Sequence, residues 1–71
     1  MTPKDVLLGK YKHYKGGIYE VLSVATHSEN KEVLVIYKLD KENTVWARPL
    51  EMFFDNVTHN GKSTPRFQKL S

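Results

Sequence analysis

Four glycine-rich or polar turns divide this chain into short segments. The turns are Gly16-Gly17, Ser28-Glu29-Asn30-Lys31, Asp40-Lys41-Glu42-Asn43 and Asn60-Gly61. Glycine and asparagine adopt the positive φ angles that tight hairpin turns need, and Asn-Gly is among the strongest short-range hairpin signals. The chain is therefore constrained to a succession of short strands that reverse direction at each turn.

The segments between the turns alternate apolar and polar residues, as β-strands do. The clearest strand is residues 32–39, in which one face carries Val33, Val35, Tyr37 and Leu39. The strand before it runs from Ile18 to about Ser28 and has apolar residues on both faces, which predicts a bend or a β-bulge. A shorter strand covers residues 10–14 and pairs with it across the glycine turn.

A strand-like segment at residues 44–48 contains the only tryptophan and one of the two arginines. If Val45 and Ala47 face the core, alternation places Trp46 and Arg48 together on the opposite, outer face. On an outer face, a large aromatic ring and a guanidinium group side by side are not needed to pack the core. The segment therefore predicts a recognition surface.

Pro49 follows this strand and can begin a short helix, because its missing N–H would be unpaired there anyway. Apolar residues at positions i, i+3 and i+4 then form a stripe that would cover one end of a barrel: Leu50, Phe53 and Phe54. A last hairpin is expected around Asn60-Gly61. Its strands are residues 56–59 and a closing strand that includes Pro65-Arg66-Phe67.

The expected fold class is mainly β: a small antiparallel SH3-like barrel of five or six strands, with one helical turn before the last hairpin. An OB-type barrel fits less well, since it usually runs longer and has a helix of several turns between its third and fourth strands. The 71 residues allow one domain. Within it, residues 1–8 form an N-terminal arm or short helix that starts at Thr2-Pro3, and residues 9–69 form the barrel.

The absence of cysteine excludes a disulfide, a thiolate metal site and a cysteine nucleophile, and it fits a reducing compartment. The first residues lack the basic and then apolar layout of a signal peptide. No apolar run approaches the roughly 20 residues that cross a bilayer. These features predict a cytoplasmic protein without a membrane association.

Four blocks of residues, in the same order, resemble a family of short bacterial proteins, the domain-of-unknown-function family 1653. The blocks are residues 9–19, residues 25–29, residues 46–53 and Pro65-Arg66-Phe67. The resemblance implies a compact domain that stands alone or forms part of a larger protein. It implies no activity, cofactor or substrate. Thr26 stands where the family pattern often has a basic residue.

A binding function is predicted from aromatic and basic side chains spread over all four of these blocks. Aromatic rings stack on bases while cations contact phosphates, and arginine adds a planar fork of donors. The candidate ligand-binding residues are Tyr11, His13, Lys15, His27, Glu29, Trp46, Arg48 and Arg66. The expected ligand is nucleic acid or a nucleotide-like anion. The arginines have an alternative role, which is to bind Glu51, Asp55 or Glu29 and fasten the final hairpin.

Two other functions fit the sequence. The exposed aromatic residues can form a protein-protein or oligomerisation interface. A small hydrolase using His27 and Glu29 is less favoured, because adjacent strand residues point to opposite faces and a small barrel has little concave volume. No catalytic residue is assigned. The three histidines have no second ligand at a characteristic spacing, so neither a metal nor a cofactor is expected.

Overall fold

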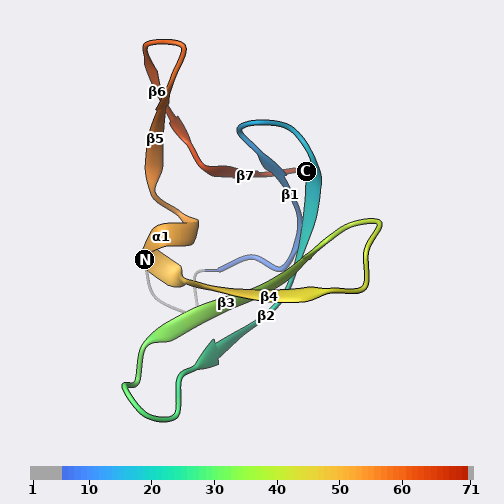
Figure 1. The fold of residues 1–71 in the computed structure, drawn as a ribbon, viewed down its shortest axis with the longest axis vertical. Helices are drawn as coiled ribbons and strands as arrows, with labels where there is room; N and C mark the ends of the chain where they lie inside the picture. The colour runs from blue at the N-terminus through green and yellow to red at the C-terminus, as the bar shows by residue number, and fades with distance from the viewer. Residues whose placement is uncertain (1–5, 71) are drawn as a thin grey trace.

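The computed structural model describes residues 6–70, and these form mainly antiparallel β-structure with one short helix (Figure 1). The elements follow the order β1 (Gly9–His13), β2 (Ile18–Thr26), β3 (Val33–Leu39), β4 (Val45–Pro49), α1 (Leu50–Phe53), β5 (Asn56–His59), β6 (Lys62–Pro65) and β7 (Phe67–Lys69). The mainly β class and the helical turn before the last hairpin are confirmed.

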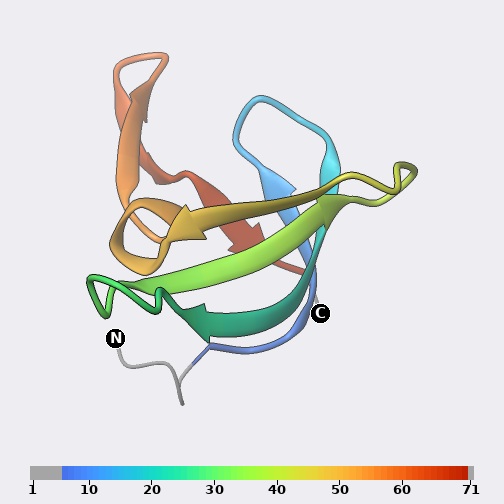
Figure 2. The same ribbon diagram turned by 60° about the horizontal axis from the view of Figure 1, so that its bottom comes forward.

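Five strands form one antiparallel sheet in the order β4-β3-β2-β1-β7, and β5 pairs with β6 in a separate two-stranded sheet. The larger sheet is strongly curved, and α1 lies at the end of β4 (Figure 2). Among residues 6–70 the sheet ends at β4 on one side and at β7 on the other. The predicted closure into a barrel is not confirmed, because no pairing joins these two strands.

The predicted irregularity in the long second strand is a β-bulge. Val21 pairs with Tyr37 on β3, but the next pair along the ladder is Ser23 with Ile36, so Leu22 is the extra residue. A bulge bends its strand and increases the local twist. In this sheet the bulge lets the first half of β2 pair with β1 while its second half continues along β3.

The core lies on the concave face of the sheet and is rich in aromatic rings. Its buried members are Val6, Tyr11, Val21, Val35, Tyr37, Leu50, Phe53 and Phe67. Phe53 of α1 stacks on Phe67 of β7, with ring centroids 4.1 Å apart and planes 1° from parallel. This contact joins the helical turn to the last strand of the sheet.

The helix begins as the sequence predicts. Pro49 has φ of −53°, which its ring imposes and which suits the entry to a helix. Leu50 and Phe53 are buried, while Phe54 is partly buried and packs against the core. The apolar stripe therefore fixes the path of the chain between β4 and β5.

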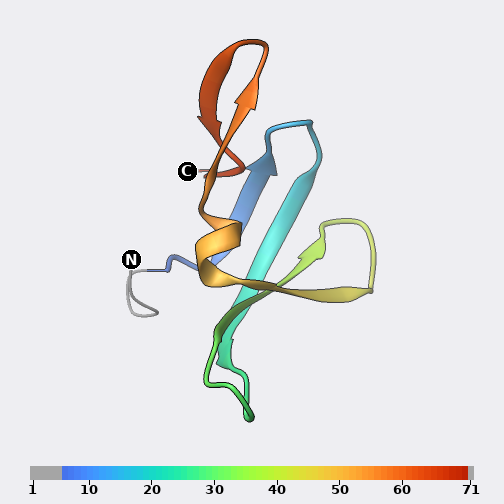
Figure 3. The same cartoon turned by 60° about the vertical axis from the view of Figure 1, so that its left-hand side comes forward.

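The closing segment differs from the prediction, which placed one strand around residues 65–67. The chain bends at Arg66, so that β6 pairs with β5 and β7 pairs with β1. The Arg66 N–H donates to the Asp55 carbonyl oxygen and the Arg66 carbonyl accepts from the Tyr14 N–H, each over 2.9 Å. These bonds hold the base of the β5–β6 hairpin, which extends away from the sheet (Figure 3).

The predicted N-terminal arm or helix falls partly outside the described residues, which exclude residues 1–5. Residues 6–8 form no helix, and Val6 is buried in the core. Within residues 6–70, the one helix has four residues and is far too short to cross a membrane.

Candidate functional site

Trp46 and Arg48 lie on the concave face of the sheet, so the predicted orientation of β4 is wrong. Trp46 pairs with Tyr37 and Arg48 pairs with Val35, and both partners on β3 are buried. Directly paired residues of antiparallel strands project to the same face. The tryptophan is nevertheless 52% exposed, because β4 is an edge strand and its concave side opens to solvent.

A pocket of about 280 Å³ opens beside Trp46. Its lining comes from β2, from β3 and its following turn, and from β4: Tyr19, Tyr37, Leu39, Glu42, Trp46 and Arg48. Three of these residues are aromatic, one is a cation and one is a carboxylate. The pocket thus offers flat apolar surfaces together with one charge of each sign.

The Arg48 side chain forms one hydrogen bond and no ion pair within residues 6–70. Its Nε donates to the Tyr37 hydroxyl over a long distance of 3.4 Å. Among residues 6–70 no carboxylate lies within ion-pair distance of its guanidinium group. The fork of donors on Arg48 is therefore available to an anion that enters the pocket.

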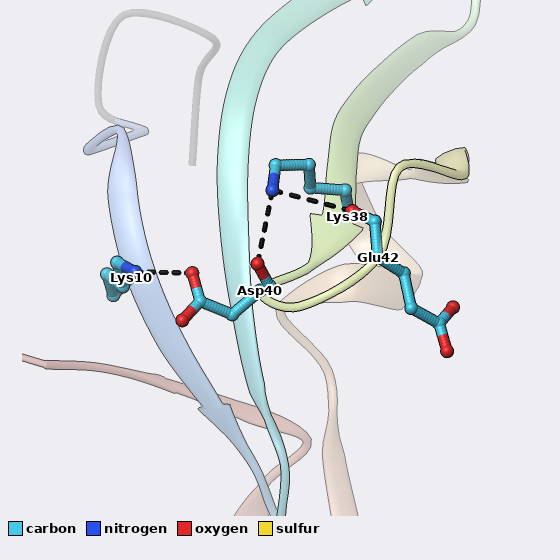
Figure 4. A network of polar contacts seen from close by, with 4 residues as sticks. All are labelled: Lys10, Lys38, Asp40 and Glu42. Carbon is cyan, nitrogen blue, oxygen red and sulfur yellow. Dashed lines mark hydrogen bonds and ion pairs between the residues drawn. The ribbon is translucent and has the colours of Figure 1, made fainter.

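The turn that carries Glu42 is held by lysines (Figure 4). Lys38 Nζ donates to the backbone oxygens of Asp40, at 3.3 Å, and Glu42, at 3.5 Å. Lys10 on β1 forms an ion pair with the Asp40 carboxylate. In Figure 4 the Glu42 carboxylate points away from Lys38. These contacts fix the turn that forms one wall of the pocket.

His13 lies at the end of β1 among aromatic rings. Its ring is 4.9 Å from that of Phe67 and 6.0 Å from that of Tyr19, which lines the pocket. Its Nδ1 accepts a hydrogen bond from the Lys15 N–H at 3.1 Å. Burial lowers the pKa of His13, and the positive charges of Arg66 and Arg48 lower it further. The neutral imidazole is thus favoured here.

Arg66 is bound by a carboxylate within the protein. Its Nε donates to Asp55 Oδ1 at 2.6 Å and its Nη2 donates to Oδ2 at 3.2 Å. Hydrogen bonding to Arg66 lowers the pKa of Asp55. This two-point pair fastens the base of the β5–β6 hairpin, which is the structural role considered for the arginines.

The two remaining candidates from the first block differ in exposure. Tyr11 is only 3% exposed, and its hydroxyl donates to the Leu7 carbonyl oxygen at 2.7 Å. Burial raises the pKa of Tyr11. Lys15 is exposed in the β1–β2 turn and lies over the ring of Tyr14 at 5.7 Å. Tyr11 therefore supports the core, while Lys15 remains accessible.

His27 and Glu29 lie in the turn between β2 and β3, far from Trp46. They follow the end of β2, whereas Trp46 is near the opposite end of β3, a strand about 20 Å long. The Nδ1 of His27 accepts from the Glu29 N–H at 3.1 Å, so the histidine organises the turn. No hydrogen bond between the two side chains exists among the described residues.

The structure brings Trp46 and Arg48 into one pocket and places His13 close to its Tyr19 wall. Sequence reasoning missed Tyr19, Tyr37 and Glu42 as members of this pocket. The alternation of residues 33–39 predicts Tyr37 as a core residue, and it is buried. The pairing of β3 with β4 also brings its hydroxyl to Arg48, which the sequence does not show. No group of three His, Asp or Glu side chains able to hold a metal occurs within residues 6–70.

Comparisons with known proteins agree on the family. The family described as "Protein of unknown function (DUF1653)" matches residues 9–69. A crystal structure of a DUF1653 protein from Bordetella bronchiseptica superposes with a TM-score of 0.87 and is 29% identical, covering 97% of this chain and 92% of that chain. No curated protein sequence matches significantly.

Proposed function

We propose a function for this chain, which belongs to the DUF1653 family of proteins of unknown function, from the geometry of its own pocket. The chain is a small binding module that takes a nucleotide-like ligand, one that joins a flat ring to an anionic group. The observation that carries the proposal is that the half-exposed Trp46 and Arg48, which has no ion pair within residues 6–70, line the same pocket.

The two side chains suit the two parts of such a ligand. A base stacked on the indole of Trp46 gains roughly 1–3 kcal/mol, whichever base it is. The guanidinium of Arg48 offers N–H donors in a plane, the arrangement that binds phosphate at two points. Tyr19 and Tyr37 add apolar surface at the back of the pocket.

Glu42 determines where the anion is placed. Its carboxylate lines the same pocket and repels a phosphate. The phosphate therefore lies on the Arg48 side, and the ring lies between Trp46 and the tyrosines. An uncharged ring edge with N–H donors can face Glu42.

The arrangement of strands supports a finer fold assignment, an SH3-like sheet with an open side. Four strands in antiparallel order are followed by one helical turn, and the last strand returns to pair with β1. The opening lies at β4, the strand that carries Trp46. An open edge at this position gives the ligand access to the concave face.

The experiment that tests the proposal is a titration of the full chain with a nucleoside monophosphate, read by tryptophan fluorescence. Trp46 is the only tryptophan, so any quenching reports on this pocket. Quenching that saturates and weakens as salt is added supports the proposal. A flat curve at low salt, for both purine and pyrimidine nucleotides, contradicts it.

A protein interface is the second candidate, favoured by the exposure of β4. Val45 is 53% exposed on the outer face and Trp46 is 52% exposed on the concave face of this edge strand. An edge strand with apolar residues on both faces can pair with another chain. Sedimentation of the full chain distinguishes the two: a dimer that Trp46→Ala dissociates supports the interface.

A further inference from the structure

A second and larger pocket, of about 450 Å³, lies between the β5–β6 hairpin and the ends of β1 and β7. Figure 1 shows how the hairpin and the β1–β2 turn rise on either side of β7. Side chains from all of these elements line the pocket, among them Lys12, His13, Tyr14, His59, Lys62 and Gln68. Of the ligand-binding residues that the sequence suggests, only His13 belongs to it.

The side chains of this pocket suit an anion. Two of the lining residues are lysines and none is an aspartate or glutamate; two more are histidines, of which His13 favours its neutral form. Lys12 and Lys62 are exposed and have no ion pair among residues 6–70. Positive charges from β1 and from the hairpin thus face one concavity without a balancing carboxylate.

A row of aromatic rings connects the two pockets. Tyr19, in the wall of the Trp46 pocket, is 6.0 Å from His13 between ring centroids. His13 is 4.6 Å from Tyr14, and Tyr14 is 5.4 Å from His59 at the tip of β5. Each neighbouring pair is in contact range for aromatic rings. The rings lie tilted or edge to face against one another and are partly or fully exposed, and cations lie at the far end of the row.

We propose that the ligand is a single-stranded nucleic acid that runs from the Trp46 pocket, past His13 and Tyr14, into the second pocket, the hairpin cleft beside β5 and β6. This inference rests on the proposed function, which assigns the first base and phosphate to Trp46 and Arg48. Unpaired bases stack on the rings, and Lys12 and Lys62 contact phosphates further along the strand. A mononucleotide fills the first pocket alone.

The test compares short and long ligands on lysine variants of the full chain. Lys12→Gln and Lys62→Gln remove one cation each from the cleft. The matched control is Lys31→Gln, an exposed lysine in the β2–β3 turn, away from both pockets. The probes are thymidine monophosphate and an oligothymidylate of about ten nucleotides, a length within the range that small single-strand binding domains cover. Binding is read by Trp46 fluorescence at several salt concentrations.

We expect the oligothymidylate to bind more tightly than the monophosphate. Each cleft variant weakens oligothymidylate binding about fivefold at 0.1 M salt and reduces the salt slope by about 0.7, which is one phosphate contact. The same variants leave monophosphate binding unchanged, and Lys31→Gln changes neither.

Three outcomes overturn the inference. Equal affinity for the two probes, or cleft variants that behave as Lys31→Gln does, would mean that the Trp46 pocket binds a mononucleotide and that the hairpin cleft binds no further part of a strand. A polyglutamate of similar charge that displaces the oligothymidylate equally well shows that the protein does not recognise bases. If neither probe quenches Trp46, the proposed function itself fails.

Discussion

Trp46 and Tyr37 face each other across the β3–β4 ladder and project to the same concave face, yet one ring is half exposed and the other is buried. The difference follows from the position of their strands in the sheet. Tyr37 lies under Phe53 and Phe67, with ring centroids at 5.3 and 5.8 Å. Trp46 is one strand further out, where the core ends. The pair therefore marks the boundary between the core and the candidate pocket.

We expect Trp46→Ala to weaken binding of a labelled single-stranded oligonucleotide about 5- to 150-fold, since one stacked base contributes roughly 1–3 kcal/mol. Trp46→Phe keeps a smaller ring and retains part of the affinity. Val45→Ala is the matched control, because Val45 is equally exposed on the outer face of the same strand. Fluorescence polarisation of the labelled strand measures all three. Equal losses in Trp46→Ala and Val45→Ala would contradict the pocket.

The opposite charges in the pocket give a second prediction. Glu42→Gln removes a carboxylate and should tighten the binding of an anionic ligand, whereas Arg48→Gln removes the cation and should weaken it. Both effects should shrink as salt rises. Calorimetric titration with a nucleoside monophosphate measures them. If Glu42→Gln weakens binding instead, the pocket prefers a cation and the assignment of Arg48 to a phosphate is wrong.

The sequence predicts most turns and strands of this fold because its turn residues have few alternatives. Asn60 and Gly61 have φ angles of 54° and 76°, and Gly16 and Gly17 have φ angles of 102° and 90°. These are values that glycine and asparagine favour. The orientation of β4 could not be read in the same way. An edge strand meets solvent on both faces, so its apolar alternation does not identify the core side.

The candidate site could be predicted only in part. Trp46 and Arg48 are identified from the sequence as the only tryptophan and one of two arginines, and in the structure both line one pocket. The separation of His27 and Glu29 from them, and the pairing of Arg66 with Asp55, depend on contacts between residues distant in the sequence. The hairpin cleft depends on the bend at Arg66, where one expected strand becomes two.

Arg66 and Asp55 give a third prediction, on stability against pH. The folded-state pKa of Asp55 is below its ordinary value of 3.8. The pair therefore stabilises the fold above that value, and the stabilisation is lost as the pH falls through the lower, folded-state pKa. Asp55→Asn should lower the melting temperature at pH 7. The stability of this variant should no longer include the part that Asp55 loses on protonation in acid.

Thermal unfolding between pH 2.5 and 7 measures the effect of Asp55→Asn. The matched control is Glu29→Gln, which neutralises a carboxylate that has no ion pair among residues 6–70. We expect the control to melt close to the unaltered chain at pH 7. If both variants melt alike, the hairpin does not depend on the Arg66 pair.

His13 gives a fourth prediction, again on stability against pH. The dependence on pH is opposite to that of a histidine whose pKa is raised by a nearby carboxylate. Its pKa is lowered in the folded state, first by burial and then by the charges of Arg66 and Arg48. The unfolded chain therefore binds this proton more readily, and stability falls as the pH drops below about 6.5. His13→Asn keeps an acceptor for the Lys15 N–H and should reduce the decrease in stability between pH 7.5 and 5. Urea unfolding at each pH tests this, and an unchanged pH dependence would refute it.

Phe53 gives the last prediction, because the fold depends on its ring. It is fully buried, stacks on Phe67 and lies within 6 Å of Tyr11, Tyr37 and Phe54 between ring centroids. Phe53→Ala should destabilise the chain by about 3–5 kcal/mol, the usual loss for a buried phenylalanine. A domain of 71 residues has roughly 4–11 kcal/mol in total. At the lower end of this range the variant is largely unfolded at 25 °C.

Two further variants show whether that loss comes from the stacked ring. Phe53→Leu keeps most of the apolar volume and should cost less than Phe53→Ala, although it loses the contact with Phe67. Met52→Ala changes a residue of the same helix that is 50% exposed, and it should change stability by no more than about 0.5 kcal/mol. Urea unfolding followed by circular dichroism measures all three. Similar losses in Phe53→Ala and Met52→Ala would mean that α1 does not anchor β7, and that the concave face beside Trp46 is shaped by other contacts.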